Sequence, residues 1–184
     1  MLARPVLSGR LGRCLRRFRD ARRGAAAVEF AMLALPFFSL LCGIVELGLI
    51  FIVSTTLENA TNDTARQIRT GQLQTNGGAT ASTFATSICT ELAWLGNCAS
   101  NLNVDVRTFS QFSTITAPQP IKNNAFDPAA MTFQMGGPGN IVVVHAYYQW
   151  GLFTPLMNQG LQTLGNGKML ITSATTFRNE PYGP

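Results

Sequence analysis

An apolar run from Phe30 to Val53 constrains this chain more than any other feature. The run is 24 residues long, and only Ser39 and Glu46 interrupt it with polar side chains. As an α-helix it is about 36 Å long, which exceeds the roughly 30 Å hydrocarbon core of a bilayer. A secretory signal has a shorter apolar core of about 7–15 residues, and the small remainder of the chain could hardly enclose a helix that is apolar on all faces. We therefore predict a single transmembrane helix over residues 25–53.

Positive charge is concentrated before the apolar run. Eight of the 14 lysine and arginine residues precede Gly24, together with one acid, Asp20. This arm carries a net charge of +7, whereas the remainder, with six bases and eight acids, carries −2. Because basic clusters beside a span stay in the cytoplasm, we expect residues 1–24 to form a cytoplasmic leader and the C-terminal region to lie across the membrane. The slightly acidic remainder argues against a nucleic-acid partner.

Two carboxylates lie within or beside the predicted span. Glu29 stands near the start of the apolar run, and Glu46 lies one or two turns from its far end. A carboxylate at the bilayer centre costs about 2.5–3.5 kcal/mol on insertion scales, so such residues usually have a partner or a function. Two interpretations stay open for each. It finds a positive or donor partner on another subunit and serves assembly, or its side chain snorkels to the headgroups.

The helix is predicted to continue beyond the membrane as an extension over residues 54–74. Small and apolar residues recur there at helical spacing, two arginines lie in the last turn, and a glycine follows as a cap: Leu57, Ala60, Thr64, Ala65, Ile68, Arg66, Arg69 and Gly71. The many threonines and asparagines make this a poor autonomous helix, so we expect it to pack on a small domain.

A second helix is predicted from an N-cap at Ser82 to the Gly96-Asn97 pair, with an apolar face formed by Phe84, Ile88, Leu92 and Leu95. Cys89 and Cys98 lie nine residues apart in this element, on the oxidising side of the membrane by the charge argument. Two cysteines at this spacing with one distant histidine make no metal site, and a redox pair is typically Cys-x-x-Cys. We therefore predict a structural disulfide between them.

Three later stretches, 101–109, 141–150 and 169–177, have strand patterns. In the first, apolar residues alternate with polar ones: Leu102, Val104 and Val106 against Asn103, Asp105 and Arg107. These stretches predict an antiparallel sheet of three or four strands whose apolar face packs on the long helix. A short helix is also predicted from Pro155 to Leu164. The fold class is therefore α+β, with a small outer domain over residues 75–184.

Patterns for catalysis or metal binding are weak. The single histidine, His145, falls within a predicted strand, where a solvent-facing or hydrogen-bonded position is favoured over a catalytic base. The acids of the outer region are scattered, and no nucleophile elbow or zinc-protease motif occurs. Aromatic residues either form a binding face or fill the core, and the core is favoured in so small a domain: Trp94, Tyr147, Tyr148, Trp150 and Phe153. We therefore expect no enzyme activity, no metal and no cofactor.

Several motifs together resemble a known family. A basic leader that ends in Gly24, with Glu29 five residues later and an apolar helix behind it, resembles the type IV prepilin processing site. More narrowly, four stretches resemble TadE-like pseudopilins, which are minor pilins of the tight-adherence, Flp-type pilus system. These are Arg-Arg-Gly-Ala-Ala-Ala-Val-Glu-Phe-Ala at 22–31, Pro36, Gly-Ile-Val-Glu-Leu-Gly at 43–48, and Ala-Thr-Thr-Phe-Arg-Asn-Glu-Pro-Tyr at 174–182.

The resemblance implies a structural function with defined partners. A prepilin peptidase would cut after Gly24, Ala25 would become the new N-terminus, and Glu29 would neutralise the Ala25 ammonium group of an adjacent subunit. The small outer domain would be pilin-like. The expected partners are the peptidase, other pilin-like subunits, the tight-adherence assembly machinery and membrane lipid. The protein would be a single-pass inner-membrane protein with a cytoplasmic N-terminus and a periplasmic domain, available for incorporation into an extracellular pilus.

Two alternatives from other classes stay open. The first is an unprocessed, signal-anchored periplasmic adaptor or binding module, which would retain the whole arginine-rich arm. The second is a membrane-tethered enzyme, which would need an acidic or histidine-centred pocket; whether His145 meets a carboxylate in a cleft would test it.

Overall fold

The computed structural model describes residues 22–154 and 157–182, with the side chains of Arg22 and Arg23 left out. Most of the predicted basic leader, and the predicted helix start at Pro155, therefore lie outside the described residues. The chain divides into two compact units, residues up to Gly43 and residues from Ile44 onward.

Helix α2 (Arg22–Arg69) runs through 48 residues without a break and belongs to both units. It includes the predicted span and residues 54–69 of the predicted extension, and Pro36 lies inside it. The helix ends at Arg69, five residues before the predicted end of the extension and just before the glycine expected as its cap. Gly71 has a φ of 77°, which an L-residue adopts only with strain. Residues 72–75 then form a separate helical turn, α3 (Gln72–Thr75).

The predicted stripe on the extension is buried. The predicted stripe residues are at most 4% exposed, and so are two further residues of the same helix, Val53 and Thr61. The predicted residues are Leu57, Ala60, Thr64, Ala65 and Ile68. The hydroxyl groups of the two buried threonines donate to backbone carbonyls four residues earlier, at 2.6 and 2.8 Å. Threonine is therefore tolerated in this interface, since its polar atom is hydrogen-bonded inside the helix.

Helix α4 (Ala81–Glu91) starts and ends earlier than predicted. Its N-cap is Thr80, not Ser82, because Thr80 and Thr83 exchange side-chain-to-backbone hydrogen bonds in a capping box. The chain leaves the helix at Leu92, and the turn at Asn97 leads into helix α5 (Cys98–Asn101). The predicted disulfide between Cys89 and Cys98 is confirmed, with the two Cα atoms 5.7 Å apart.

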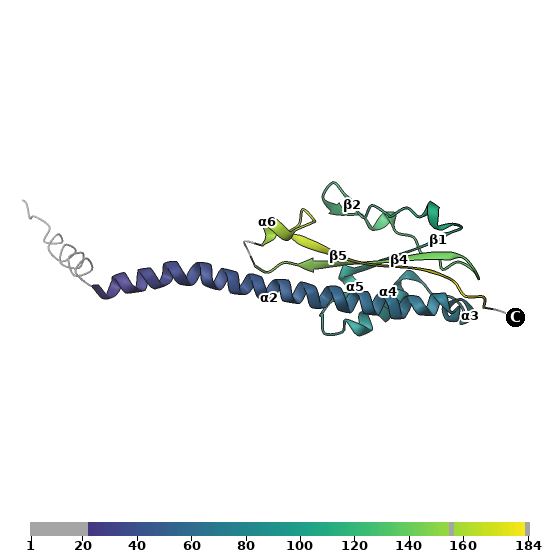
Figure 1. The fold of residues 1–184 in the computed structure, drawn as a ribbon, viewed down its shortest axis with the longest axis horizontal. Helices are drawn as coiled ribbons and strands as arrows, with labels where there is room; N and C mark the ends of the chain where they lie inside the picture. The colour runs from purple at the N-terminus through teal and green to yellow at the C-terminus, as the bar shows by residue number, and fades with distance from the viewer. Residues whose placement is uncertain (1–21, 155–156, 183–184) are drawn as a thin grey trace, which may run out of the picture. The chain divides into compact units, whose positions relative to one another are not determined.

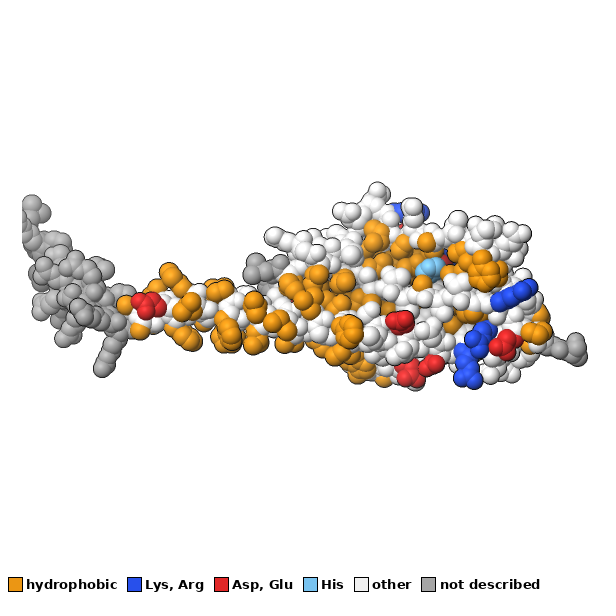
Figure 2. All heavy atoms as spheres, viewed as in Figure 1, with side chains coloured by type: hydrophobic (Ala, Val, Ile, Leu, Met, Phe, Trp, Pro, Cys, Tyr) orange, Lys and Arg blue, Asp and Glu red, His pale blue; other side chains and the backbone are white. Residues whose placement is uncertain are grey.

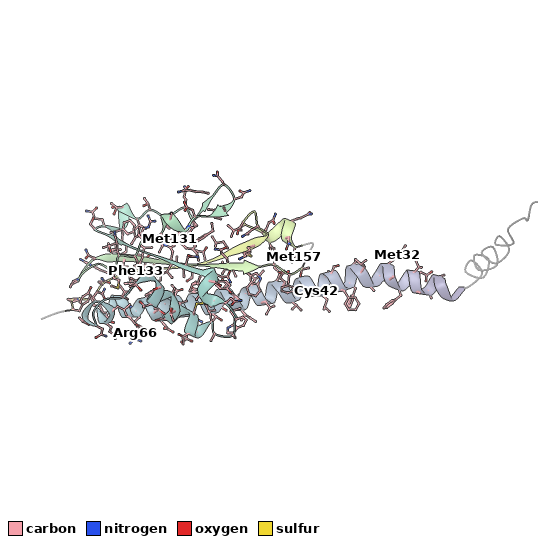
Figure 3. The ribbon with its side chains drawn as sticks, turned by 180° about the vertical axis from the view of Figure 1, so that it is seen from behind. Met32, Cys42, Arg66, Met131, Phe133 and Met157 are labelled. Carbon is pink, nitrogen blue, oxygen red and sulfur yellow. A yellow bond between two sulfur atoms is a disulfide. The ribbon has the colours of Figure 1, made fainter. Side chains whose placement is uncertain are left out.

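A three-stranded antiparallel sheet forms the centre of the second unit. Strands β1 (Leu102–Phe109), β4 (Ile141–Gly151) and β5 (Lys168–Arg178) follow the order β1-β4-β5, so β4 is central. One face of the sheet lies along the C-terminal part of α2 (Figure 1). This face and helix α4 enclose the apolar core, where the rings of Phe84 and Phe133 meet edge to face at 5.6 Å (Figure 3). The α+β class is confirmed.

The other face of the sheet is covered by irregular segments. They include a small two-stranded hairpin and short helical turns: η1 (Phe112–Thr114), β2 (Ile121–Lys122), β3 (Ala125–Phe126), η2 (Pro128–Ala130) and α6 (Asn158–Leu161). Figure 1 shows β2 and α6 on the side of the sheet away from α2. The predicted helix from Pro155 to Leu164 is thus reduced to the four residues of α6. We call this covering layer, residues 110–131 and 157–167, the outer layer. Residues 132–134 instead run beside the edge of β1 and hydrogen-bond with the Val106 backbone.

Candidate functional site

The N-terminal part of α2 presents apolar side chains to its surroundings. Large hydrophobic residues from Val28 to Val45 are 45–73% exposed, and they lie on every side of the helix. Figure 2 shows this continuous apolar surface, and Figure 3 labels Met32 and Cys42 within it. Such a surface requires lipid or other apolar helices around it. The described part of the chain contains one helix that is, by length and composition, long and apolar enough to cross a membrane, which supports a single-pass membrane protein.

Gly24 and Ala25 lie in the first turn of α2, and both are exposed. Among the described residues, no group beyond its neighbours in the helix lies within 4 Å of the position that a Gly24 side chain would take. The backbone here is helical, whereas the processing expectation used the ability of glycine to adopt an extended form. Cleavage at this bond therefore requires the first turn to unwind, which costs little at a helix end because the first four N–H groups have no partner within the helix.

Glu29 lies on the apolar part of α2 with its side chain exposed. It forms no ion pair with any residue that the structure describes. The helix thus carries an ionisable group on a surface that is otherwise apolar. A partner for its charge has to come from outside the described chain, from lipid headgroups or from water.

Glu46 is fully buried, and its donors come from its own chain. Its Oε1 atom accepts a hydrogen bond from the Phe153 backbone N–H at 2.8 Å, and Oε2 accepts one from the Thr154 N–H at 3.0 Å. Hydrogen bonds to an ionised acceptor are about twice as strong as neutral ones. Glu46 therefore joins α2 to the segment that follows β4, whereas the sequence suggested a partner subunit or the headgroups.

Backbone donors explain why this contact was missed. An N–H group is present at every residue except proline, so neither Phe153 nor Thr154 carries a signature that marks it as the partner of Glu46. The one available signal was Glu46 itself, a carboxylate that an apolar helix keeps despite its cost.

The C-terminal segment holds the other end of α2. The Glu180 N–H donates to the Arg69 carbonyl at 2.9 Å, and the two side chains form an ion pair at 3.2 Å. The Asn179 amide donates to the carbonyls of Met135 and Gly137, both at 3.0 Å. Next to it, the Tyr182 ring occupies the position that a Cβ atom on Gly71 would take. This segment belongs to the stretch 174–182 that resembles TadE-like pseudopilins, but the sequence predicted no role for it.

His145 does not form a catalytic pair with the carboxylate opposite it. Asp105 is its cross-strand neighbour, but its Oδ1 atom accepts from the Thr132 N–H at 2.7 Å and its Oδ2 atom from Arg107 Nε at 2.8 Å. The imidazole stacks on the Tyr147 ring at 5.9 Å, and its buried Nδ1 atom has no hydrogen-bond partner among the described residues. Burial lowers the pKa of His145, against the opposing effect of the Asp105 charge.

Asp105 itself departs from the expected alternation, since it was placed on the polar face of its strand. It is fully buried, and Thr132, whose carbonyl accepts from the Val106 N–H at the edge of β1, supplies donors to its Oδ1 atom. Arg107 completes the arrangement by donating from Nη2 to the Ala130 carbonyl at 2.6 Å. Together these contacts attach the chain at Ala130 and Thr132 to β1.

The aromatic residues divide between core and surface. Tyr147 and Tyr148 are buried as expected, and burial raises the pKa of Tyr147 to about 12. Trp94 and Phe153, which were expected in the core, are both 52% exposed. Each follows the end of a regular element, α4 or β4, where the chain turns outward. Within the described residues, no three His, Cys, Asp or Glu side chains come together as a metal site.

The comparison with protein families gives one match. Residues 24–66 match the family model described as TadE-like protein. The match confirms the resemblance over the segment that contains Gly24, Glu29, Pro36 and Glu46. A comparison with curated proteins and another with solved structures found no match.

Proposed function

Because residues 24–66 are TadE-like, we propose that the protein is a pseudopilin that prepilin peptidase processes after Gly24. The mature chain would start at Ala25 and assemble with other pilin-like subunits of a tight-adherence pilus through helix α2. Its role is structural and not catalytic. The observation that carries the proposal is the position of Glu29, which lies on the apolar helix of the TadE-like segment and has no ion-pair partner among the described residues.

The charge distribution supports an orientation. The leader carries eight arginines and one acid before Gly24, and such a cluster is held on the cytoplasmic side. The peptidase would act there, and the outer domain would lie in the periplasm. The Cys89–Cys98 disulfide supports this, because disulfides persist in oxidising compartments such as the periplasm.

Glu46 supports a shorter span than the apolar run alone suggests. Its carboxylate is bound by the irregular backbone at Phe153 and Thr154, and irregular backbone is not exposed to lipid within the hydrocarbon core. The span would then end before Glu46. Residues 25–45 form about 31 Å of helix at 1.5 Å per residue, which matches a core of about 30 Å. Glu46 would thus stabilise the subunit fold, and Glu29 would serve assembly.

Assembly would use the two charges that processing leaves near the helix start. Cleavage creates an ammonium group at Ala25, and a neighbouring subunit in the correct axial register would place its Glu29 carboxylate against it. In an apolar environment a charge is tolerated only with such a partner. The ion pair would stabilise one axial register of neighbouring helices, whereas apolar contacts alone would allow many registers.

The variant Glu29→Gln tests this mechanism in the native host. It should insert into the membrane at the wild-type level, while its incorporation into pili falls at least about tenfold, since breaking a buried ion pair costs about 3–5 kcal/mol. The measurement is quantitative immunoblotting of membranes and of sheared pili. Glu58→Gln, an exposed position on the same helix, is the matched control. Wild-type incorporation of Glu29→Gln would contradict the pairing.

The alternative of an unprocessed periplasmic adaptor keeps the helix and the domain but has no use for the Ala25 ammonium group. It predicts that the membrane form of the protein retains its leader. It also predicts that Glu29→Gln has no effect on partner binding.

A further inference from the structure

An open cavity of about 650 Å³ lies between the sheet and the outer layer. Its walls come from β1, β4, the β2–β3 hairpin and the turn before β5. Side-chain amides and one aromatic ring dominate the lining: Asn103, Asn123, Asn124, Gln149, Asn166 and Phe126. No lysine, arginine, aspartate, glutamate or histidine belongs to the lining found among the described residues. The volume falls within the roughly 300–1,000 Å³ of small-molecule sites.

Most of these amides have no hydrogen-bond partner. Among the described residues, only Asn166 uses its side chain, accepting from the Lys168 N–H at 3.2 Å. The side chains of the other four form no hydrogen bond within the described chain: Asn103, Asn123, Asn124 and Gln149. Each primary amide offers two donors and an acceptor with two lone pairs. The cavity thus presents free donors and acceptors side by side.

The mixture of donors and acceptors points to the chemistry of a ligand. An anion requires donors and usually a basic residue, and a metal cation requires carboxylate or carbonyl oxygens. Neither kind of charge lines this cavity, and Lys122 and Asp127, which flank the lining residues of the hairpin in sequence, form an ion pair at 2.7 Å. A hydroxyl group donates one hydrogen bond and accepts two. A primary amide can therefore accept from the hydroxyl hydrogen through its oxygen and donate to the hydroxyl oxygen through its NH₂ group.

Phe126 adds an apolar wall to the amides. Its ring contacts Tyr147 at a centroid distance of 5.9 Å and remains half-buried, so one face is supported while the ring still reaches the cavity. Aromatic rings in ligand sites bind apolar faces, while a few placed polar groups fix the orientation of the ligand. The C–H face of a sugar ring, surrounded by hydroxyl groups, has this combination of properties.

The walls are held in place without the free amides. Asn123 and Asn124 form the two-residue turn of the β2–β3 hairpin, with φ values of 51° and 59°. The hairpin is tied to the turn before β5 by a hydrogen bond from the Gly165 N–H to the Asn124 carbonyl at 2.6 Å. A site whose frame is already fixed loses less conformational entropy when a ligand binds.

We propose that this cavity binds a neutral carbohydrate, an uncharged oligosaccharide of the kind displayed on cell surfaces. Asn103, Asn124 and Gln149 hydrogen-bond its hydroxyl groups, and Phe126 contacts the apolar face of one ring. The inference uses only the outer domain and does not depend on cleavage after Gly24 or on the role of Glu29.

A glycan array probed with the detergent-solubilised full chain tests the proposal. The array carries neutral, sialylated and sulfated oligosaccharides, and hits are titrated as free sugars by isothermal calorimetry. We expect neutral glycans to bind and the free neutral sugar to compete. Binding to no glycan, or only to sialylated or sulfated ones, would overturn the proposal.

Asn124→Gly is the decisive variant, because glycine keeps the positive φ of the turn while it removes the amide. Its affinity for the neutral glycan should fall at least about tenfold with unchanged or increased thermal stability. Gln149→Ala, on strand β4, should weaken binding to a similar extent. Asn59→Ala removes an exposed amide from α2 and is the control that should bind as wild type. Wild-type affinity in both cavity variants would also overturn the assignment.

Discussion

Glu46 is the residue whose surroundings change its interpretation most. In the sequence it is a carboxylate inside an apolar run, and in the structure it is a fully buried acceptor for two backbone N–H groups. A buried carboxylate is stable when such donors replace its water. The two carboxylates of the helix therefore differ in kind, since Glu29 is exposed and has no ion-pair partner among the described residues.

Replacing Glu46 by glutamine should loosen the segment after β4. Glutamine has one acceptor oxygen, and its NH₂ group would face a second N–H donor, so one hydrogen bond is lost and a donor is left unpaired. We expect a loss of about 1–3 kcal/mol in unfolding free energy and faster hydrogen exchange at the amides of Phe153 and Thr154. Glu58→Gln is the control for removal of a helix carboxylate. Unchanged exchange at both amides would show that the contact does not hold the segment.

His145 gives the folded domain a defined response to acid. Burial lowers its pKa below 6.5 in the folded chain, although Asp105 opposes the shift and Arg107 adds to it. The unfolded chain then binds the proton more readily, so stability contributed by the neutral imidazole is present above pH 6.5 and is lost as the pH falls from there through the lower pKa of the folded chain.

The variant His145→Gln isolates this effect, because the chain contains one histidine. The wild-type protein should lose more unfolding free energy than the variant between pH 7.5 and pH 5. Denaturant titrations of both proteins in the same detergent at the two pH values provide the measurement. Equal losses would mean that His145 is not protonated differently in the folded and unfolded chains.

At the scale of the element, the C-terminal end of α2 depends on Gly71 and Tyr182. Gly71 combines a φ of 77° with a position where any Cβ atom would overlap the Tyr182 ring. The Tyr182 hydroxyl in turn donates to the Gly136 carbonyl at 3.2 Å. The glycine thus ends the helix and also makes room for the segment that fixes the helix end.

Comparing Gly71→Ala with Gly77→Ala separates these two contributions. Gly77 also has a positive φ, 92°, but nothing lies within 4 Å of its Cβ position. Gly77→Ala should cost about 1–2 kcal/mol from backbone strain alone, and Gly71→Ala should cost clearly more because the Tyr182 ring must also move. Urea unfolding of the two variants measures the difference. Equal costs would show that Tyr182 contributes nothing to the end of α2.

Periodic patterns predicted the long elements well. The length of the apolar run predicted the first part of α2. The 3.6-residue period predicted the extension of α2 and helix α4, and the alternating and β-branched stretches predicted the three strands of the sheet, because each of these elements buries an apolar face. The shorter elements β2, β3 and α6 have two to four residues each, too few to show a period. The N-cap was misplaced by two residues, since Thr80 and Ser82 are both capping residue types and only Thr80 forms the box with Thr83.

At the scale of the whole molecule, sequence and structure contribute different parts of the candidate site. Charge asymmetry, the apolar run and the Gly24–Glu29 spacing can be read directly from the sequence, because membranes and peptidases act on local sequence. The partner of Glu46 and the amide-lined cavity join residues more than twenty positions apart. The first contact depends on where the segment after β4 meets α2, the second on how the outer layer folds over the sheet, and no local pattern encodes either.

Processing after Gly24 can be tested directly by identifying the first residue of the mature chain. The protein is extracted from membranes of its native host, and its intact mass and N-terminal sequence are determined. The account predicts a mature chain that starts at Ala25 and lacks the arginine-rich leader. A membrane-bound chain that retains the leader in full would contradict processing after Gly24 and leave no Ala25 ammonium group to pair with Glu29.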